Sequence, residues 1–383
     1  MSDASLGNKK LSVCQIIPSL PLHGAQNLLL KICQNLNPEK INTSILLLSG
    51  EGPLIDDFKK IGIPVTLIRK NWRYDISIIW RVRKYLRSGR FDIVHTHLFT
   101  ADFWGRLAAL NTGISIVSTA HNGIPENITN LIRLENFFNR ILARFSEKII
   151  CVTNQVRNSL LNDVKIPIDK LMVIDNGIEI LKIEDIPPKE KARKLLDIEV
   201  EVPVIGVVGR FSKEKNHPMF IKSLVPIIAH FPKLVVLLVG EGGELERETK
   251  SLVTQLNIER NVRFLGLRRD ISIVLRALDS LVIPSISEGL PMVLIEAMTL
   301  GTPVIATRVG GIPDAITEGN NGLLAELNQT NLTEKILWAL ENPSEMEKMA
   351  EQGFGDSRQR FDIYETSRRY FDLYKSLQEK NHF

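Results

Sequence analysis

Residues 280–306 read SLVIPSISEGLPMVLIEAMTLGTPVIA, and this stretch indicates the fold of the chain. The apolar run 281–283 predicts a short buried strand. Pro291 predicts the start of a helix, because its fixed φ suits a first helical turn, where its missing N–H costs nothing. Gly301 predicts the end of that helix, and a second apolar strand follows at 304–306. A strand, loop, helix and strand in this order build a parallel sheet.

The junction between this loop and its helix predicts an anion site. The backbone N–H groups of Gly289, Leu290 and the first helical turn have no intrahelical partner and lie at the positive end of the helix dipole. Phosphate groups bind at such positions. Glu288 and Glu296 are about 10 Å apart along the helix axis. A pyrophosphate at the helix start would therefore bring a sugar hydroxyl near Glu288 and a ribose hydroxyl near Glu296, whereas two solvated glutamates are the alternative for the spacing alone.

Four motifs follow one another here: EGLPMVLIEAM from Glu288, GTPVIA from Gly301, GGIPD from Gly310 and GLL from Gly322. Together they resemble the donor-binding half of the family 4 retaining glycosyltransferases. The resemblance implies the GT-B architecture, an α/β fold in which two Rossmann-like, doubly wound domains face each other across a central cleft.

Length and patterning agree with two domains. A chain of 383 residues is longer than most single domains. Apolar strands alternate with helical stretches through residues 1–180, which predicts a first doubly wound domain. Residues 181–200, which include two prolines, read as a linker, and 201–365 as a second domain. The resemblance implies that the first domain lies on the acceptor side and that the second binds the nucleotide sugar. The resemblance implies that the C-terminal helix, 366–383, packs back on the first domain.

Composition points to the cytoplasm. Apolar residues make up 44% of the chain, charged residues 24%, and no window resembles a transmembrane span. The three cysteines form no CxxC pair, which argues against a disulfide framework and against a zinc site.

Two strand ends of the first domain carry candidate site residues. His121 follows the strand predicted at 115–119, and ligands bind at the carboxyl ends of parallel strands. The resemblance implies that His121 lies beside the donor sugar, and that its rival, His97, lies on the acceptor side. Gly24 follows the first strand, where it would let the backbone approach a phosphate. The family usually has two glycines there, and His23 replaces the first.

Two cations follow the first strand of the second domain, in the segment RFSKEKN at 210–216. The resemblance implies that Arg210 and Lys215 hold the donor pyrophosphate. Fixed cations at that place would stabilise the charge that grows on a departing diphosphate. A solvated corner is the alternative for two cations on a turn. Glu241, at a later strand end, is assigned by resemblance to the enclosure of the nucleotide base.

These residues predict a retaining transferase that needs no metal. No Asp-x-Asp segment is present to hold a divalent cation, and no paired carboxylates indicate a glycosidase. The donor would be a UDP- or GDP-linked sugar, with no further cofactor. A nucleotide-sugar epimerase, a phosphorylase and a non-catalytic nucleotide-sugar-binding subunit are the alternatives. The catalytic candidates are His121, Arg210, Lys215 and Glu288; the donor-binding candidates are Gly24, Glu241, Gly289, Leu290 and Glu296.

Charge is spread unevenly. Residues 1–180 carry 22 Lys and Arg against 15 Asp and Glu. The cations Arg81, Arg83, Lys84 and Arg87 gather on one predicted helix, which is either a solvated amphipathic face or a contact with anionic lipid. The second interpretation predicts a lipid-linked saccharide acceptor of bacterial surface polysaccharide synthesis, at the inner face of the membrane. Nucleic acid is not expected, because no recognition motif accompanies the charge.

Overall fold

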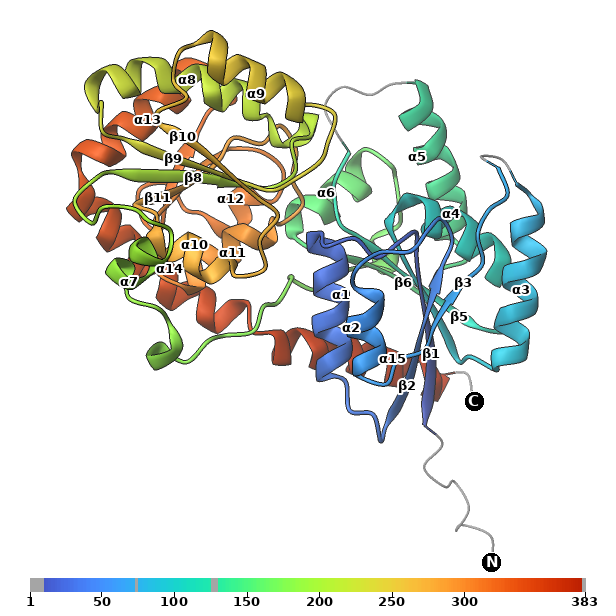
Figure 1. Cartoon of the computed structure of the whole chain (residues 1–383). Helices are drawn as coiled ribbons and strands as arrows, with labels where there is room; N and C mark the ends of the chain where they lie inside the picture. Colours follow the sequence, from blue (N-terminus) through green and yellow to red (C-terminus); the bar gives the residue numbers. More distant parts are fainter. Residues whose placement is uncertain (1–9, 73–74, 125–129, 381–383) are drawn as a thin grey trace, which may run out of the picture. The chain divides into compact units, whose positions relative to one another are not determined.

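The computed structural model describes residues 10–72, 75–124 and 130–380. The chain divides into two compact units, Met1–Glu179 with Ile363–Phe383, and Ile180–Asp362. Each unit is a parallel sheet flanked by helices (Figure 1). Within the part of the chain that is described, no helix is both long enough and apolar enough to span a bilayer.

The first unit has a seven-stranded sheet in the order β3-β2-β1-β4-β5-β6-β7. Its strands are β1 (Leu11–Ile17), β2 (Ile41–Leu47), β3 (Val65–Leu67), β4 (Ile93–His97), β5 (Ser115–Ala120), β6 (Lys148–Cys151) and β7 (Leu171–Val173). Its helices are α1 (Gly24–Asn35), α2 (Ile55–Lys60), α3 (Ser77–Gly89), α4 (Leu98–Ala109), α5 (Asn130–Ala143), α6 (Asn154–Asn162) and α15 (Ile363–Lys380). The strand order reverses between β1 and β4, and ligands of doubly wound sheets bind at such a switch point.

The second unit has a six-stranded sheet in the order β10-β9-β8-β11-β12-β13. Its strands are β8 (Val204–Val208), β9 (Val235–Val239), β10 (Val262–Gly266), β11 (Ser280–Ile283), β12 (Val304–Thr307) and β13 (Leu323–Ala325). Its helices are α7 (Lys189–Leu195), α8 (His217–His230), α9 (Glu246–Gln255), α10 (Ile271–Ala277), α11 (Met292–Thr299), α12 (Ile312–Ala315), α13 (Gln329–Glu341) and α14 (Pro343–Arg360). Here the order reverses between β8 and β11, so the loops that follow these two strands lie at the switch point.

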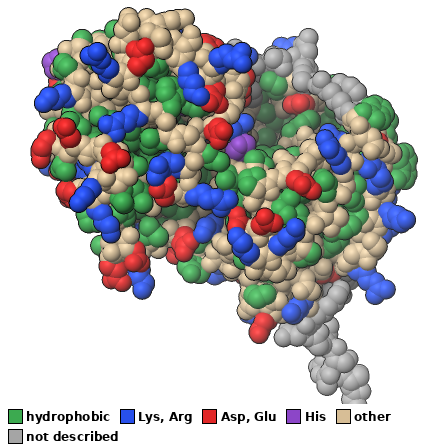
Figure 2. Space-filling model, viewed as in Figure 1, with side chains coloured by type: hydrophobic (Ala, Val, Ile, Leu, Met, Phe, Trp, Pro, Cys, Tyr) green, Lys and Arg blue, Asp and Glu red, His purple; other side chains and the backbone are tan. Residues whose placement is uncertain are grey.

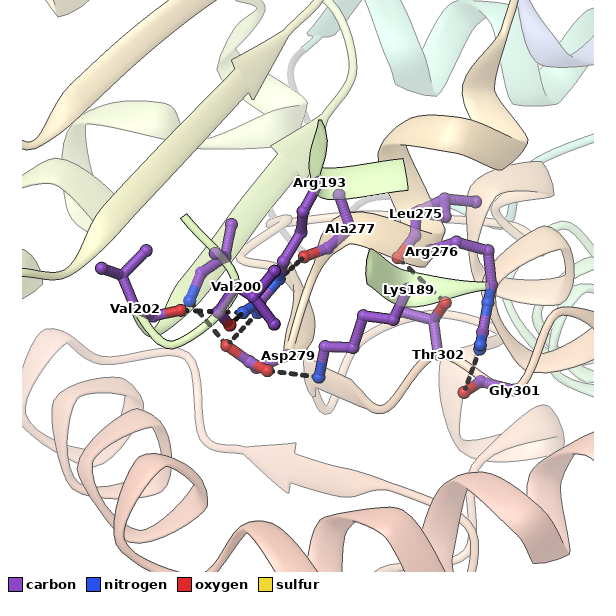
Figure 3. A network of polar contacts seen from close by, with 11 residues as sticks. Lys189, Arg193, Val200, Val202, Leu275, Arg276, Ala277, Asp279, Gly301 and Thr302 are labelled. Atoms are coloured by element: carbon purple, nitrogen blue, oxygen red, sulfur yellow. Dashed lines mark hydrogen bonds and ion pairs between the residues drawn. The ribbon is translucent and has the colours of Figure 1, made fainter. Parts of the chain in front are cut away.

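The segment expected as a linker, residues 181–200, belongs to the second unit. Arg193 of α7 is buried and donates to the carbonyl oxygens of Ala277 and Val202, each at 3.0 Å. Asp279 accepts from Arg193 at 2.8 Å and from the backbone N–H of Val204 at 2.7 Å (Figure 3). These bonds tie α7 to the first strand of the unit, which is why the segment does not behave as a free connection.

Helix α15 returns the chain to the first unit at Ile363, three residues before the boundary expected from the sequence. The backbone N–H of Ile363 donates to the carbonyl oxygen of Ile178 at 2.9 Å. Tyr370 and Tyr374 of this helix are almost completely buried, and α15 packs against α1 and β1. Two buried aromatic side chains with polar tips need hydrogen-bond partners inside the unit.

Candidate functional site

The loop between β11 and α11 is held in place by bonds to neighbouring strands. Pro291 immediately precedes α11 and has extended backbone angles, so the helix begins at Met292. Thr307 of β12 donates its hydroxyl to the carbonyl oxygen of Ser285 at 2.5 Å. The N–H of Ile286 donates to the carbonyl oxygen of Glu214 at 2.7 Å. The predicted anion-binding loop is therefore an ordered part of the second unit.

Glu288 is the centre of a polar cluster in this loop. Its Oε1 accepts from the Ser285 hydroxyl at 2.7 Å and from Lys215 Nζ at 2.5 Å. The Glu288 side chain is only 11% exposed, and that of Lys215 26%. Gly289 and Leu290, which follow, are buried. The structure thus brings Lys215 and Glu288 into contact, two residues that lie far apart in the sequence.

Gly310 explains part of the GGIPD motif. Its φ is +50°, in the left-handed region that favours glycine, and a Cβ there would lie 1.7 Å from the carbonyl oxygen of Glu288. The next N–H, of Gly311, donates to that same oxygen at 3.2 Å. The motif therefore supports the backbone of Glu288 from behind.

Arg210 lies on the loop that follows β8 and is exposed. This loop runs beside the one after β9, where Phe211 N donates to the Gly242 carbonyl at 2.9 Å and Lys213 N to Glu244 Oε1 at 2.9 Å. Hydrogen bonds from backbone N–H groups, with smaller contributions from the charges of Lys213 and Arg210, lower the pKa of Glu244. The exposed Arg210 side chain therefore extends from a backbone segment that hydrogen bonds hold in place.

The two remaining carboxylates of the second unit differ from each other. Glu241 is exposed beyond the end of β9. Glu296 is half-buried on α11, and burial raises its pKa to about 7. None of the described residues forms an ion pair with Glu296. A carboxyl group in this state exchanges its proton near neutral pH, so an added hydrogen-bond donor would favour the ionised form.

The first unit contains a chain of hydrogen-bonded rings that ends at His121. His97 Nε2 lies 2.8 Å from Gln15 Oε1, and His97 Nδ1 lies 3.4 Å from His121 Nε2. Gln15 Nε2 donates to the Tyr374 hydroxyl at 3.1 Å. That hydroxyl is 2.5 Å from His95 Nδ1. The chain therefore connects β1, β4 and the end of β5 with the C-terminal helix.

One direction of donation satisfies every group in this chain. Because Gln15 Oε1 can only accept, His97 donates from Nε2 and accepts at Nδ1, so His121 donates from its Nε2. Tyr374 then donates to His95 Nδ1, and His95 Nε2 donates to the Thr119 hydroxyl, 2.7 Å away. This assignment leaves His121 Nδ1 as an acceptor.

Burial keeps the three imidazoles neutral. Desolvation lowers the pKa of His95 to about 3 and that of His121 to about 4, and it lowers the pKa of His97 well below its ordinary value. The rings of His95 and His97 are stacked at a centroid distance of 4.3 Å. At pH 7 this cluster can orient a hydroxyl group and cannot supply a positive charge.

The predicted site residues thus fall into two groups. Arg210, Lys215, Glu241, Gly289 and Glu296 lie in the second unit, together with Glu288 and Leu290, whereas Gly24 and His121 lie in the first. Gly24 is the first residue of α1 and is exposed. Among the residues that the structure describes, no three His, Cys, Asp or Glu side chains are grouped to hold a metal ion.

Sequence reasoning missed three residues that organise these groups. Gln15 was visible as a polar residue inside an apolar strand, a position where the side chain must find a partner. Ser285 and Tyr374 gave no such signal, because a serine in a loop and a tyrosine on an amphipathic helix are ordinary.

Comparisons with known proteins identify the family of the chain. The family model described as Glycosyltransferase Family 4 matches residues 22–180, and the one described as Glycosyl transferases group 1 matches 188–356. A UDP-Gal:alpha-D-GlcNAc-diphosphoundecaprenol alpha-1,3-galactosyltransferase of Escherichia coli is 28% identical over 83% of this chain and 84% of its own length. The uncharacterized glycosyltransferase MJ1178 of Methanocaldococcus jannaschii is 30% identical over 71% of this chain and 72% of its own.

Solved structures share the fold. Anabaena Alr3699/HepE in complex with UDP-glucose superposes with a TM-score of 0.84 at 22% identity, covering 96% of this chain and 100% of that one. A glycosyltransferase from Rickettsia africae gives 0.80 at 23% identity, covering 96% and 99%. The two family models, the archaeal relative and the shared fold place this chain among the GT-B glycosyltransferases of the group 1, family 4 type, and it is a glycosyltransferase.

Proposed function

We propose that the protein transfers a sugar, with retention of anomeric configuration, from a UDP-sugar to a hydroxyl group of a lipid-linked saccharide. The observation that carries this proposal is the Lys215–Glu288–Ser285 cluster at the start of α11. It puts a cation, a carboxylate and the N-terminus of α11 within reach of one ligand. A nucleoside diphosphate sugar presents a matching set, namely a diphosphate beside a ring of hydroxyls.

In this proposal the second unit binds the donor and stabilises the leaving group. The first-turn N–H groups of α11 and the cations Arg210 and Lys215 contact the diphosphate, and Glu288 accepts from a sugar hydroxyl. Glu296 accepts from the ribose, which draws its carboxyl toward the ionised form. Charge grows on the diphosphate as the bond to the anomeric carbon breaks, so the cations act most strongly in the transition state.

The transfer step needs no protein nucleophile. The acceptor oxygen forms its bond to the anomeric carbon on the face that the diphosphate leaves, and its proton passes to the departing phosphate oxygen. We assign His121 a positioning contact with the donor sugar through Nδ1, its free acceptor. A neutral imidazole suits this contact, because a hydroxyl group then donates to it without a charge being buried.

The relatives and the charge of the first unit support a proposal for the acceptor and the compartment. The Escherichia coli relative is named for a diphosphoundecaprenol-linked acceptor, and Anabaena HepE is described with UDP-glucose. We propose a polyprenyl-diphosphate-linked saccharide as acceptor, used at the cytoplasmic face of a membrane in surface polysaccharide synthesis. The basic first unit is the side we expect to meet that membrane.

A donor panel tests the proposal. The purified protein is incubated with UDP- and GDP-linked hexoses, with and without a polyprenyl-diphosphate-linked N-acetylhexosamine, before and after treatment with EDTA. We expect one UDP-sugar to give an α-linked product only when acceptor is present, with activity retained after chelation. A β-linked product, or a strict need for Mg²⁺ or Mn²⁺, would contradict the proposed chemistry.

A further inference from the structure

Helix α5 exposes a continuous stripe of large apolar side chains. Successive members are three, one, three and four residues apart, and at about 100° per residue this spacing puts them on one helical face. They are Leu134 (52% exposed), Phe137 (57%), Phe138 (36%), Ile141 (38%) and, two residues beyond the helix end, Phe145 (54%). We call this set the α5 stripe. Isolated exposed apolar residues need no explanation, but a contiguous set on one face marks a contact surface.

The opposite face of α5 is already packed, so the stripe is not a core surface that lacks its partner within this unit. Leu142 and Ala143 are buried, and Arg106 of α4 donates to Asn139 Oδ1 at 2.8 Å. The stripe also continues onto α4. The Phe103 ring meets Phe138 edge-on at 5.4 Å and lies 6.3 Å from Phe99, which is 46% exposed.

Arginines line one flank of the stripe. Arg133, Arg140 and Arg144 are spaced by seven and four residues and are all exposed. From Ile132 to Phe145 the one acidic residue is Glu135, which is only partly exposed and whose pKa is raised by burial. An apolar face beside a row of cations, with no exposed acid among them, fits a surface that is apolar below and negative above.

We propose that the α5 stripe, with Phe99, inserts into the headgroup region of an anionic membrane while the three arginines contact lipid phosphates. This rests on the proposed function, in which the acceptor is held in a membrane, and it names the surface that meets it. A second copy of the chain is a poorer occupant, because an antiparallel two-fold contact between the stripes would bring the two arginine rows near each other. Each arginine near the surface would strengthen binding about fivefold at low salt.

The basic helix α3, expected from the sequence to meet lipid, is less suited to the role. Arg81 pairs with Asp75 and donates to the Arg69 carbonyl at 2.8 Å. Arg83 donates to the carbonyl oxygens of Leu107 and Ala108, both at 3.0 Å. Two of the four cations there hold the unit together. On the face drawn in Figure 2, Lys and Arg are interspersed with Asp and Glu in both units, so charge alone selects no surface.

The test compares the two helices in the full-length protein. Co-sedimentation is measured with vesicles of phosphatidylcholine alone and of phosphatidylcholine with phosphatidylglycerol, at low and high salt. We expect Phe137→Gln/Ile141→Gln to weaken binding to the anionic vesicles at least tenfold. Arg133→Gln/Arg140→Gln/Arg144→Gln should remove most of the salt-dependent part. The matched control, Lys84→Gln/Arg87→Gln on α3, should bind as the wild type does.

Transfer to a short water-soluble acceptor is measured in the same variants. The variants should transfer sugar to this acceptor at close to the wild-type rate, because the donor site is untouched. If the wild type itself shows no transfer to this acceptor, the result contradicts the proposed function and not the assignment of the membrane surface. Wild-type protein that ignores anionic vesicles, or binding lost in the α3 control and kept in the α5 variants, would overturn the assignment of this surface. So would a wild-type dimer that the Phe137→Gln/Ile141→Gln variant converts to a monomer.

Discussion

The two units use the same sheet architecture and gather opposite kinds of chemistry at it. In the second unit, Lys215 and Glu288 form an ion pair that remains partly open to solvent. In the first, His95, His97 and His121 are held neutral by burial. In the proposed function, the cations of the second unit meet the departing diphosphate, and the neutral imidazole of His121 meets the donor sugar. The fold supplies the strand ends in both units, and local burial determines whether the side chains there are charged or neutral.

The two groups also differ in how they are built. Backbone bonds hold the loops of the second unit, and flexible side chains reach out from them. The hydrogen-bonded rings of the first unit are held by side chains on three strands and on α15, so each ring has little freedom to move. Substitutions in the loops of the second unit should therefore change kinetics more than stability. Substitutions among the hydrogen-bonded rings of the first unit should change stability more than kinetics.

The largest effect is expected at Arg210. Arg210→Ala should lower kcat on the order of 100-fold and change the apparent affinity for the UDP-sugar far less, because the charge it meets grows during the reaction. Thermal stability should not change, since the side chain is exposed. Steady-state kinetics with the donor varied is the measurement. Arg247→Ala, an exposed arginine on α9, is the control. An equal loss in both variants would remove Arg210 from the site.

A second substitution separates backbone support from side-chain chemistry. Gly310→Ala should cost more than tenfold in kcat/KM and lower Tm, because its Cβ would overlap the Glu288 carbonyl at 1.7 Å. Gly319→Ala is the control, since Gly319 also has a left-handed φ of +71° but has no atom within 4 Å of the added Cβ. Both variants share the strain of about 1 kcal/mol for a left-handed alanine. Activity in Gly310→Ala that matches the control would show that the support is dispensable.

Much of the second unit was predictable from sequence. The run 280–306 predicted a strand, a helix start at Pro291 and a second strand, and the structure has β11, α11 and β12 there. The prediction succeeds because apolar runs, Pro and Gly determine the backbone conformation at their own positions in the sequence. The contact between Lys215 and Glu288 was out of reach, since 73 residues separate them and no local pattern joins them. Family resemblance named both residues without predicting that they touch.

The hydrogen-bonded rings of the first unit, in contrast, could not be predicted from sequence as a network. His121 and His97 were singled out separately, as alternatives, and the structure places them 3.4 Å apart in one network. Tyr374 completes that network from 253 residues beyond His121 in the sequence. Side-chain networks across strands depend on tertiary packing, so no periodicity reports them. The hydrogen-bond partners of Arg81 and Arg83 on α3 were not visible in the sequence for the same reason.

A third prediction addresses this network. Tyr374→Phe removes the hydroxyl that Gln15 and His95 share, and it leaves two buried polar groups without a partner. The free energy of unfolding should fall by about 1–3 kcal/mol. Urea denaturation is the measurement. Tyr364→Phe, on the exposed start of the same helix, should change it by less than about 0.5 kcal/mol. Equal stability of the two variants would mean that the network does not hold α15.

The pH dependence of wild-type stability gives a second measure of the network. The folded pKa values of His95 and His121, about 3 and about 4, lie below the ordinary 6.5. A lowered folded pKa means that the unfolded state binds protons more readily. The part of the free energy of unfolding that is linked to these two histidines is therefore present above pH 6.5 and is lost as the pH falls toward 4. A flat profile over that window would contradict neutral, buried imidazoles.

The smallest effect is expected at Glu296, and its sign is opposite. Its folded pKa of about 7 lies above the ordinary 4.5, so the folded state prefers the protonated carboxyl. The associated stability is fully present below pH 4.5 and is lost as the pH rises through 7. Glu296→Gln imitates the protonated form. Without ligand, it should raise Tm by about 2 °C at pH 8 and leave it unchanged at pH 4.5. With a saturating UDP-sugar the order should reverse at pH 8, because the wild-type carboxylate accepts from the ribose and the amide accepts less strongly.

Glu248→Gln, an exposed glutamate on α9, is the control and should follow the wild type at both pH values. A variant that is no more stable than the wild type at pH 8 would show that Glu296 is ionised without cost. If the UDP-sugar raises the Tm of Glu296→Gln as much as it raises that of the wild type, donor binding does not need this carboxylate.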